Sequence, residues 1–363
     1  SLNQHQAPNE TTFTVVCEHG TCQVQFHHSR WRWQSDPTAE WEEERFFQAQ
    51  IGSTVNRRRR ARSLYAQEQL TLRRNLTLTA GVRFDDFDVG EDPLTTKFSA
   101  AYRIRGAGTK IRGVVGEGVK RPSFSDLFGI STFTGNPNLK SEKQENWEMG
   151  VDQDLLGGKM KWTATYFETY LKNLIAFSFG GFPNGMSFEN ISKVRLKGAE
   201  FSAALIDLEY FTLRVSYNTL DTVVLDDRDG AGGSSFVQGR ELLRRPNWWW
   251  SGSVLYHPDR LSAGVFVNQV GDRRDGDFRP FVDGSNGGAA RTVNNPGFTK
   301  IDLALAYDLI PERGPAARKG GWLQARRLTA EFRANNILDE DYDEVFGFNA
   351  PGISLYAGFR LRF

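Results

Sequence analysis

The chain has 363 residues, of which 39% are hydrophobic and 13% aromatic, and its formal net charge is +1. A net charge this close to zero argues against a broad nucleic-acid-binding surface. No apolar run reaches the ~18 residues of a transmembrane helix. A transmembrane strand needs only about 10 residues with every second one apolar, so the composition does not exclude a membrane protein.

The first feature along the chain is a cysteine pair, Cys17 and Cys22, between two segments of alternating pattern. Four residues separate the cysteines, a spacing that suits a disulfide across the tip of a hairpin in an oxidising compartment. The alternative is a metal site that recruits His19, His27 and His28, but this spacing fits no standard zinc pattern. The sequence therefore predicts a disulfide and no metal site.

Segments in which apolar and polar residues alternate fill most of the chain. In residues 75–88, for example, Leu78, Val82 and Phe84 share one face and Arg83 lies on the other. Side chains of a β-strand point alternately to its two faces, so each such segment is expected to be a strand with one apolar face. About sixteen strands are predicted, at residues 11–16, 21–33, 45–53, 62–71, 75–88, 96–105, 110–118, 142–155, 159–175, 190–207, 211–224, 247–257, 261–272, 298–308, 327–336 and 353–363.

The last of these segments, 353–363, shows why such strands need a special environment. Its apolar face, which includes Leu355, Phe359 and Leu361, is followed by no element that would cover it. An edge strand of this kind is an aggregation hazard in a soluble protein. Either another element packs on it, or the sheet closes into a barrel whose apolar face meets lipid.

The connections between the segments alternate in length. Short turns are expected near residues 73, 106, 157, 207 and 258, and long loops at 119–141, 176–189, 225–246, 273–296 and 339–349. Short turns at one rim and long loops at the other are typical of outer-membrane barrels. Tryptophans near strand ends also favour a membrane, with ordinary core packing as the alternative; they are Trp147, Trp162, Trp248, Trp250 and Trp322. The run Arg57–Arg60 is expected to be a solvated loop tip.

Two motifs go beyond this pattern. The sequence GNPNLKSE at residues 135–142 leads into WEMG at 147–150, and ANNILDEDY at 334–342 precedes the last segment, which ends on Phe363. In this combination, residues 41–363 resemble the barrel of TonB-dependent outer-membrane receptors. Ser141 stands where proline is common in that family.

The resemblance implies an all-β fold, an antiparallel transmembrane β-barrel. The family's barrel has about 22 strands and is plugged by an N-terminal domain. Residues 1–363 are therefore expected to be the C-terminal part of such a barrel, without the plug and the first strands. The stretches LLRRPNW at 242–248 and VFGFNAPG at 345–352 resemble receptors for cobalamin or iron-siderophore complexes.

By the same resemblance, the expected function is energised uptake of a scarce, bulky solute, such as an iron-siderophore complex or cobalamin, across the outer membrane. A TonB–ExbB–ExbD complex would supply the energy through the plug, and outer-membrane lipid and lipopolysaccharide would surround the barrel. Two alternatives remain at this point. One is a passive porin-like channel of about sixteen strands, and the other is a soluble secreted β-protein with a binding or hydrolase function.

No catalytic motif, phosphate loop or dinucleotide fingerprint occurs, so neither an enzymatic activity nor a cofactor is expected. Ligand capture is expected to depend on aromatic and polar residues of the long loops. The candidates are Phe124, Phe128, Phe133, Phe177, Phe179, Phe182, Phe236, Arg240, Phe278, Phe281, Phe346 and Phe348. The acidic tips at 226–229, 272–277 and 339–343 are expected to be solvated turns, with Ca²⁺ binding as the alternative.

Overall fold

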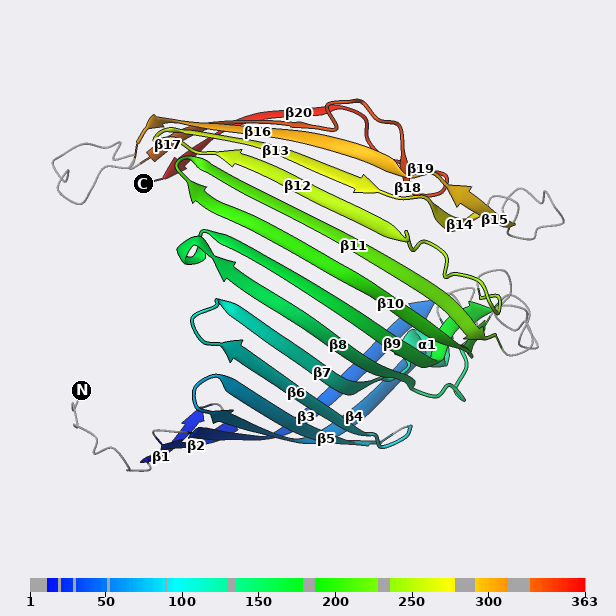
Figure 1. Ribbon diagram of the computed structural model, residues 1–363. Coiled ribbons are helices and arrows are strands. Elements are labelled where there is room, and N and C mark those ends of the chain that lie inside the picture. Colours follow the sequence, from blue (N-terminus) through cyan, green and yellow to red (C-terminus); the bar gives the residue numbers. More distant parts are fainter. Residues whose placement is uncertain are drawn as a thin grey trace, which may run out of the picture. The chain divides into compact units, whose positions relative to one another are not determined.

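The computed structural model describes residues 12–18, 21–28, 31–50, 53–88, 90–129, 135–178, 187–227, 236–277, 291–311 and 327–362. These residues form an all-β structure in which neighbouring strands of the main sheet follow one another along the chain (Figure 1). The exceptions are the short helix α1 (Phe124–Phe128) and the 3-10 turn η1 (Leu156–Gly158). In the described part of the chain, no helix has the length and apolar character needed to cross a membrane.

The main sheet has sixteen strands, the number that the sequence predicts. In order across the sheet they are β1 (Thr12–Glu18), β2 (Thr21–His28), β3 (Trp31–Gln50), β4 (Ser53–Leu72), β5 (Leu76–Phe87), β6 (Leu94–Ile104), β7 (Thr109–Lys120), β8 (Glu142–Leu155), β9 (Met160–Ser178), β10 (Ser187–Leu208), β11 (Phe211–Asp226), β12 (Trp248–Tyr256), β13 (Leu261–Val270), β16 (Phe298–Ile310), β17 (Arg327–Asn335) and β20 (Ser354–Arg362). Two small hairpins stand apart from this sheet: β14 (Arg273–Asp277) with β15 (Arg291–Asn295), and β18 (Asp343–Val345) with β19 (Phe348–Asn349). Within the described part of the main sheet, β1 and β20 are the two edge strands.

The chain forms two compact units. The first consists of residues 1–151, 165–197 and 222–242, and the second of residues 152–164, 198–221 and 243–363. Strands β1–β7 and helix α1 therefore belong to the first unit, and β12–β20 to the second. Each unit has a set of buried polar side chains of its own, which is where the candidate sites lie.

Tight turns occur where the sequence predicts them. Arg73 and Arg74 have φ values of 49° and 61° between β4 and β5, and Leu156 and Gly157 bend the chain between β8 and β9 with φ values of 51° and 65°. A positive φ in the left-handed region is what a two-residue hairpin turn requires, because it matches the twist of the flanking strands. These turns explain why successive strands lie next to each other and run antiparallel.

Two connections break the expected contrast between short turns and long loops. Strands β16 and β17 are joined by residues 311–326, at the ends where short turns were expected. Strands β3 and β4 are joined by residues 51–52 alone, at the ends where the other connections are longer. The contrast is therefore a tendency in this chain, and loop length by itself does not assign the two ends of the strands.

The prediction of a solvated loop tip at Arg57–Arg60 was wrong. These arginines lie inside β4 and pair with β3, where Glu44 is opposite Arg59 and Glu43 is opposite Arg60. Opposite charges on directly opposed residues stabilise an antiparallel pair. The expectation was wrong because it took the arginines alone, without the acidic run that mirrors them about residues 51–52.

Exposure in the described residues is inverted relative to a soluble protein. Leu78, Val82 and Phe84 on one face of β5 are exposed, whereas Asp85 on the other face and Ser63 beside it are buried. Buried polar residues outnumber buried apolar ones, 14 to 5, so the described residues contain no ordinary apolar core. Such an extensive exposed apolar face marks a surface that lipid or a partner covers.

The apolar face also carries a charged residue among its hydrophobic ones, and several aromatic pairs. Glu68 on β4 is directly opposite Ser35, whose hydroxyl donates to Glu68 Oε1 at 2.6 Å. The ring centroid of Trp147 lies 5.3 Å from that of Tyr166. Of the other tryptophans expected near strand ends, Trp162 lies near the start of β9 beside Phe201, Trp248 and Trp250 lie in β12, and Trp322 lies outside the described residues.

Candidate functional site

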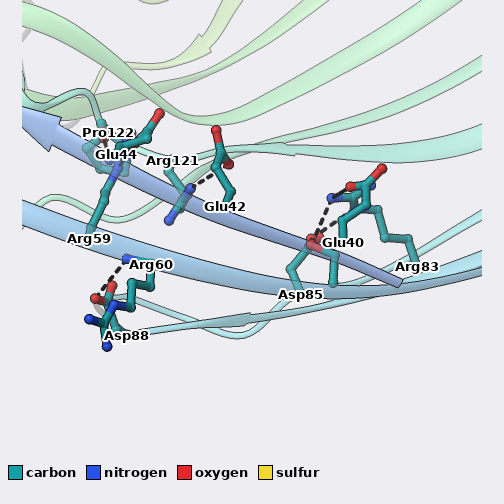
Figure 2. Close-up of polar contacts among 11 residues, drawn as sticks. Glu40, Glu42, Glu44, Arg59, Arg60, Arg83, Asp85, Asp88, Arg121 and Pro122 are labelled. Atoms are coloured by element: carbon teal, nitrogen blue, oxygen red, sulfur yellow. Dashed lines mark hydrogen bonds and ion pairs between the residues drawn. The ribbon is translucent and has the colours of Figure 1, made fainter. Parts of the chain in front are cut away.

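One face of β3 carries a row of acidic residues that ends in an aromatic ring. Because side chains alternate along a strand, Glu40, Glu42, Glu44 and Phe46 share this face. Figure 2 shows that the three carboxylates meet arginines from three different segments of the first unit. The row therefore ties β4, β5 and the segment after β7 to β3.

Glu40 pairs with Arg83 of β5, whose Nη2 lies 3.0 Å from Glu40 Oε2 (Figure 2). Arg83 also donates from Nε to Asp85 Oδ1 at 2.9 Å and from Nη2 to Ser63 Oγ at 2.9 Å. The Ser63 hydroxyl in turn donates to Asp85. The buried carboxylate of Asp85 thus has a cation and a hydroxyl as partners, which is the condition under which a carboxylate tolerates burial.

Glu42 pairs with Arg121, which directly follows β7. Arg121 Nη2 lies 3.6 Å from Glu42 Oε2, and the guanidinium lies over the ring of Phe87 at 4.1 Å from its centroid. Arg121 Nη1 is buried without a hydrogen-bond partner in the described part of the chain. Burial lowers the pKa of Arg121 and the nearby charge of Arg59 lowers it further, against the opposing effect of Glu44.

Glu44 pairs with Arg59 of β4, whose Nε donates to Glu44 Oε2. Arg59 Nη1 also donates to the carbonyl oxygen of Pro122 at 2.6 Å. The same guanidinium lies over the ring of Phe124, 4.6 Å from its centroid. Arg59 thus links β3 to the start of the loop after β7, and it places Phe124 beside Phe46.

A stack of aromatic rings and guanidinium groups completes this site. The ring of Phe124 stacks on Phe46 with centroids 5.3 Å apart and lies 6.2 Å from Phe128. The guanidinium of Arg57 lies over Phe128 at 5.1 Å. We name these five residues the Arg–Phe cluster: Phe46, Arg57, Arg59, Phe124 and Phe128. Arg57 is exposed and makes no ion pair within the described residues, so its charge is available to a ligand.

Helix α1 holds the two loop phenylalanines in place although it is only five residues long. Ser123 caps it by accepting a hydrogen bond from the Asp126 amide at 3.1 Å, and the Asp126 carboxylate accepts one from the Ser123 amide at 2.7 Å. This reciprocal capping box satisfies two amides that the helix leaves free. Gly135 is packed so closely on the backbone of Phe128 and Gly129 that a Cβ there would overlap it.

Two buried asparagines anchor the GNPNLKSE stretch that follows α1. The Asn136 amide donates to Asp126 O at 2.8 Å, and its side-chain Nδ2 donates to Phe188 O at 2.9 Å. Asn190 of β10 accepts from the Lys140 amide at 2.7 Å and donates to the Lys140 carbonyl at 2.8 Å. The stretch is therefore a structural clamp that fixes α1, and through it the phenylalanines, against β10.

The second unit has a separate buried polar centre at Asp275 of β14, whose side chain is 0% exposed. Its Oδ1 accepts from Arg244 Nε at 2.7 Å and from the Gly276 amide at 2.6 Å. Its Oδ2 accepts from the Phe346 amide at 2.9 Å and from Asn295 Nδ2 at 3.5 Å. One carboxylate therefore joins the segment before β12, the β14–β15 hairpin and the β18–β19 hairpin, an arrangement that we name the Asp275 knot.

The electrostatics of the knot favour a charged Asp275. Burial by itself raises the pKa of this carboxyl. Hydrogen bonds from Arg244, Phe346 and Gly276 outweigh burial, and the pKa lies below its usual value. The carboxylate is therefore ionised at neutral pH and holds the Phe346 backbone in place.

The ANNILDEDY motif at residues 334–342 directly precedes the β18–β19 hairpin and is held by hydrogen bonds of its own. Asn336 exchanges hydrogen bonds with the backbone of Glu340, at 2.9 Å from Nδ2 and 3.0 Å to Oδ1, and donates to Pro351 O at 3.3 Å. Tyr342 stacks on Phe298 with ring centroids 4.1 Å apart. The motif thus has a structural role here, which is to close the loop that leads into β20.

The predicted ligand residues fall into separate places. Phe124 and Phe128 come together in the Arg–Phe cluster. Half-buried Phe236 and exposed Arg240 follow β11 in the first unit, whereas half-buried Phe346 and exposed Phe348 lie on the β18–β19 hairpin of the second. Phe177 lies in β9, but its side chain is outside the described residues, as are Phe133, Phe179, Phe182, Phe278 and Phe281.

The structure also bears on the predicted disulfide and on the alternatives in which His, Cys or acidic residues bind a metal ion. Cys17 and Cys22 are directly opposite each other in the β1–β2 pair, a register compatible with the disulfide, which stays a prediction. Within the described ranges, no group of three or more His, Cys, Asp or Glu is placed to hold a metal ion. Asp339 and Asp343 instead accept hydrogen bonds from the amides of Ile353 and Gly347, at 2.9 and 2.7 Å.

Sequence reasoning missed most of the Arg–Phe cluster. Phe46 was expected in a strand, and Arg57 and Arg59 were expected in a solvated loop tip, so none of the three was a ligand candidate. The signal that would have found them is the mirrored pair of runs, EWEEE at 40–44 and RRRR at 57–60, because antiparallel register places them side by side.

Comparison with known proteins gives consistent results. The family described as "TonB dependent receptor-like, beta-barrel" matches residues 5–337. Among solved structures, the chain resembles a ferric enterobactin receptor mutant from Pseudomonas aeruginosa in complex with enterobactin, at 14% identity and a TM-score of 0.68, covering 93% of this chain and 54% of that one. The siderophore receptor PirA from Acinetobacter baumannii (15% identity, TM-score 0.67, 93% and 54%) and the copper transporter OprC (14% identity, TM-score 0.64, 93% and 55%) are similar as well. The chain thus spans about half the length of these structures.

Proposed function

Because this chain belongs to the TonB-dependent receptor-like β-barrel family, we propose that it is part of an outer-membrane receptor for energised uptake of a bulky solute. Residues 1–363 would form part of the barrel, and TonB, ExbB and ExbD would deliver energy through a plug domain. The coverage of about half of the solved relatives supports this division of the whole protein. The whole receptor's transport activity is part of the proposal.

The exposure pattern supports a place in the outer membrane. Leu78, Val82 and Phe84 present an exposed apolar face, while the opposite face of the same sheet region buries Ser63 and Asp85. In water this face would be costly, because each square ångström of apolar surface left exposed forfeits about 25 cal/mol. Lipid removes that cost, and strands that alternate in this way span a membrane many times in a barrel.

The Arg–Phe cluster supports an anionic, ring-bearing ligand such as an iron-siderophore complex. The aromatic surface of Phe46, Phe124 and Phe128 offers stacking area. Arg57 adds a positive charge that no ion pair in the described residues neutralises. A site with a few placed polar groups on an aromatic lining is typical for ligands of this size, and guanidinium groups stack on rings while binding carboxylate or phenolate oxygens.

Cobalamin is the alternative ligand, and the two differ in charge. An anionic iron chelate gains from Arg57, whereas a ligand with little net negative charge gains mainly from the rings. Replacing Arg57 with alanine therefore separates the two ligand classes, because it removes charge and leaves Phe46, Phe124 and Phe128 in place.

A binding experiment with neighbouring arginines tests the proposal. Purified full-length receptor in detergent would be titrated with a panel of ferric siderophores and with cobalamin, and bound ligand followed by tryptophan fluorescence. Arg57→Ala is expected to weaken binding of the ferric siderophore by about tenfold, the value of one charge-assisted contact. Arg58→Ala is the matched control, since Arg58 lies next to Arg57 on the opposite face of β4. Binding of cobalamin alone, or equal effects of the two substitutions, would contradict the iron-siderophore assignment.

A further inference from the structure

Two arginines lie directly opposite each other on the exposed face of the β3–β4 pair. Arg45 and Arg58 are register partners, and their side chains are 77% and 53% exposed. Directly opposed residues of an antiparallel pair have Cβ atoms about 5 Å apart, and like charges at that position are destabilising. Arg45 and Arg58 therefore repel each other, and an anion bound between the two guanidinium groups would replace this repulsion with attraction.

One carboxylate is shared among three guanidinium groups at this place. Glu43 lies 2.7 Å from Arg45, 3.8 Å from Arg58 and 3.1 Å from Arg60, and its side chain is only 13% exposed. A single negative charge leaves an excess of two positive charges on these four residues. Since each guanidinium has five N–H donors, donors remain for an added anion.

The acidic groups at the end of β5, Asp86 and the following Asp88, lie to one side of this excess. Asp86 pairs with Arg62 at 3.9 Å. Asp88 accepts a hydrogen bond from the backbone amide of Arg60 at 2.8 Å (Figure 2). The positive charge is therefore concentrated between β3 and β4, at Arg45 and Arg58.

Apolar side chains replace charged ones a short distance along the same face of all three strands. On β3, Trp41 follows Glu43 in the alternation and is 63% exposed. On β4, Leu64 follows Arg62 and is also 63% exposed, and on β5, Phe84 lies directly opposite Leu64. Positions two residues apart in a strand are separated by about 6.7 Å. The change from guanidinium to hydrocarbon thus occurs over the height of a lipid headgroup.

We propose that Arg45, Arg58 and Arg60 bind the phosphate group of an outer-membrane lipid whose acyl chains lie on Trp41, Leu64 and Phe84. This inference rests on the proposed membrane location and assigns a residue-level lipid site to it. A free anion would need only the arginines, whereas the adjacent exposed hydrocarbon surface fits an amphiphile. Arginine suits phosphate because its planar fork donates two parallel hydrogen bonds, and phosphate relieves the repulsion between Arg45 and Arg58.

Native mass spectrometry of the purified full-length receptor in maltoside detergent tests the proposal. Phosphatidic acid is the probe. Inorganic phosphate tests the contribution of the phosphate group alone, and a phosphate-free diacylglycerol tests the contribution of the acyl chains alone. The wild type is expected to bind one phosphatidic acid saturably, and Arg45→Ala/Arg58→Ala to bind it about tenfold or more weakly. Glu43→Gln removes the competing carboxylate and is expected to tighten binding. Arg57→Ala, on the opposite face of β4, is the matched control and is expected to leave lipid binding unchanged.

Two results would overturn the lipid site. One is equal phosphatidic acid affinity in wild type and Arg45→Ala/Arg58→Ala, with both proteins folded as judged by a heat-modifiable band on a gel. The other is displacement of the lipid by inorganic phosphate at the concentration at which the lipid itself binds. That result would show that the arginines bind a free anion. If the double alanine variant does not fold, Arg45→Lys/Arg58→Lys keeps the charge, loses the fork, and is expected to bind with intermediate affinity. Failure of the lipid site can be distinguished from failure of the proposed function. A receptor that is monodisperse without detergent would refute the membrane location before any lipid is added.

Discussion

Asp275→Asn is the substitution whose effect follows most directly from the geometry. Asparagine keeps the size of the side chain, but one of its two terminal groups becomes an N–H donor. Oδ1 faces donors from Arg244 and Gly276, and Oδ2 faces donors from Phe346 and Asn295. In either rotamer the new NH₂ group therefore opposes two donors, and two hydrogen bonds of the knot are lost.

The expected cost is moderate and local. Hydrogen bonds to a charged group contribute about 1.5–3 kcal/mol each, and the lower end applies because the Arg244 side chain is 41% exposed and its charge is screened. Two bonds at about 1.5 kcal/mol give about 3 kcal/mol, or roughly a hundredfold larger population of the open knot. The β18–β19 hairpin is a small unit outside the main sheet, so it is expected to open without unfolding the strands.

Hydrogen–deuterium exchange measures this opening. In the Asp275→Asn variant, protection of the Phe346 amide is expected to fall by roughly a hundredfold, while amides of β16 and β17 keep their protection. Asp277→Asn is the matched control, because Asp277 is equally buried on the same hairpin but pairs with Arg291. A change of less than about threefold at Phe346, or an equal change in both variants, would refute the role given to Asp275.

The pKa of Asp275 is lowered in the folded protein, so its carboxylate stabilises the knot above the ordinary pKa of about 3.9, and this stability is lost as pH falls through the lower folded value. Exchange protection of the Phe346 amide is therefore expected to be flat from neutral pH to about pH 5 and to fall below about pH 4. A loss of protection that begins near neutral pH would contradict this prediction. Leu78→Arg places a charge on the lipid face and is expected to cost about 2–4 kcal/mol in refolding into vesicles, whereas Thr79→Arg on the other face costs about 1 kcal/mol or less; equal costs would argue against the face assignment. Gly135→Ala adds a Cβ into the backbone of Phe128 and Gly129 and is expected to expose α1 to protease, with Gly358→Ala, which has open space, as the control. Cys17 and Cys22 are expected to react with iodoacetamide only after reduction, and alkylation of untreated protein would rule out the disulfide.

The period-two pattern predicted the strands well because it is set by backbone geometry. The alternation in residues 75–88 was sufficient to place Leu78 and Phe84 on one face and Asp85 on the other, and the structure has them there. The strands are nevertheless longer than predicted, as β3 shows by continuing from Trp31 to Gln50 through Pro37. Local propensity argues against a strand at that proline, but pairing with β4 over the whole length outweighs it.

The candidate sites were predicted less well, because they depend on residues that are distant in the sequence. Arg121 meets Glu42 and Phe87 across separate strands, and Asp275 of β14 meets Arg244 before β12 and Phe346 of the β18–β19 hairpin. No spacing rule links such residues. The loop phenylalanines Phe124 and Phe128 were found because aromatic residues in a long loop are informative by themselves. Their partner Phe46 looks like an ordinary strand residue, and Arg57 and Arg59 look like part of a solvated charged run.

Uptake of a labelled ferric siderophore by cells that carry the complete gene as their only receptor distinguishes energised import from passive diffusion. Energised import predicts saturable uptake that stops when TonB is deleted, and a lower initial rate with Arg57→Ala than with Arg58→Ala. Uptake that continues unchanged without TonB would contradict the account, because it would identify a passive channel.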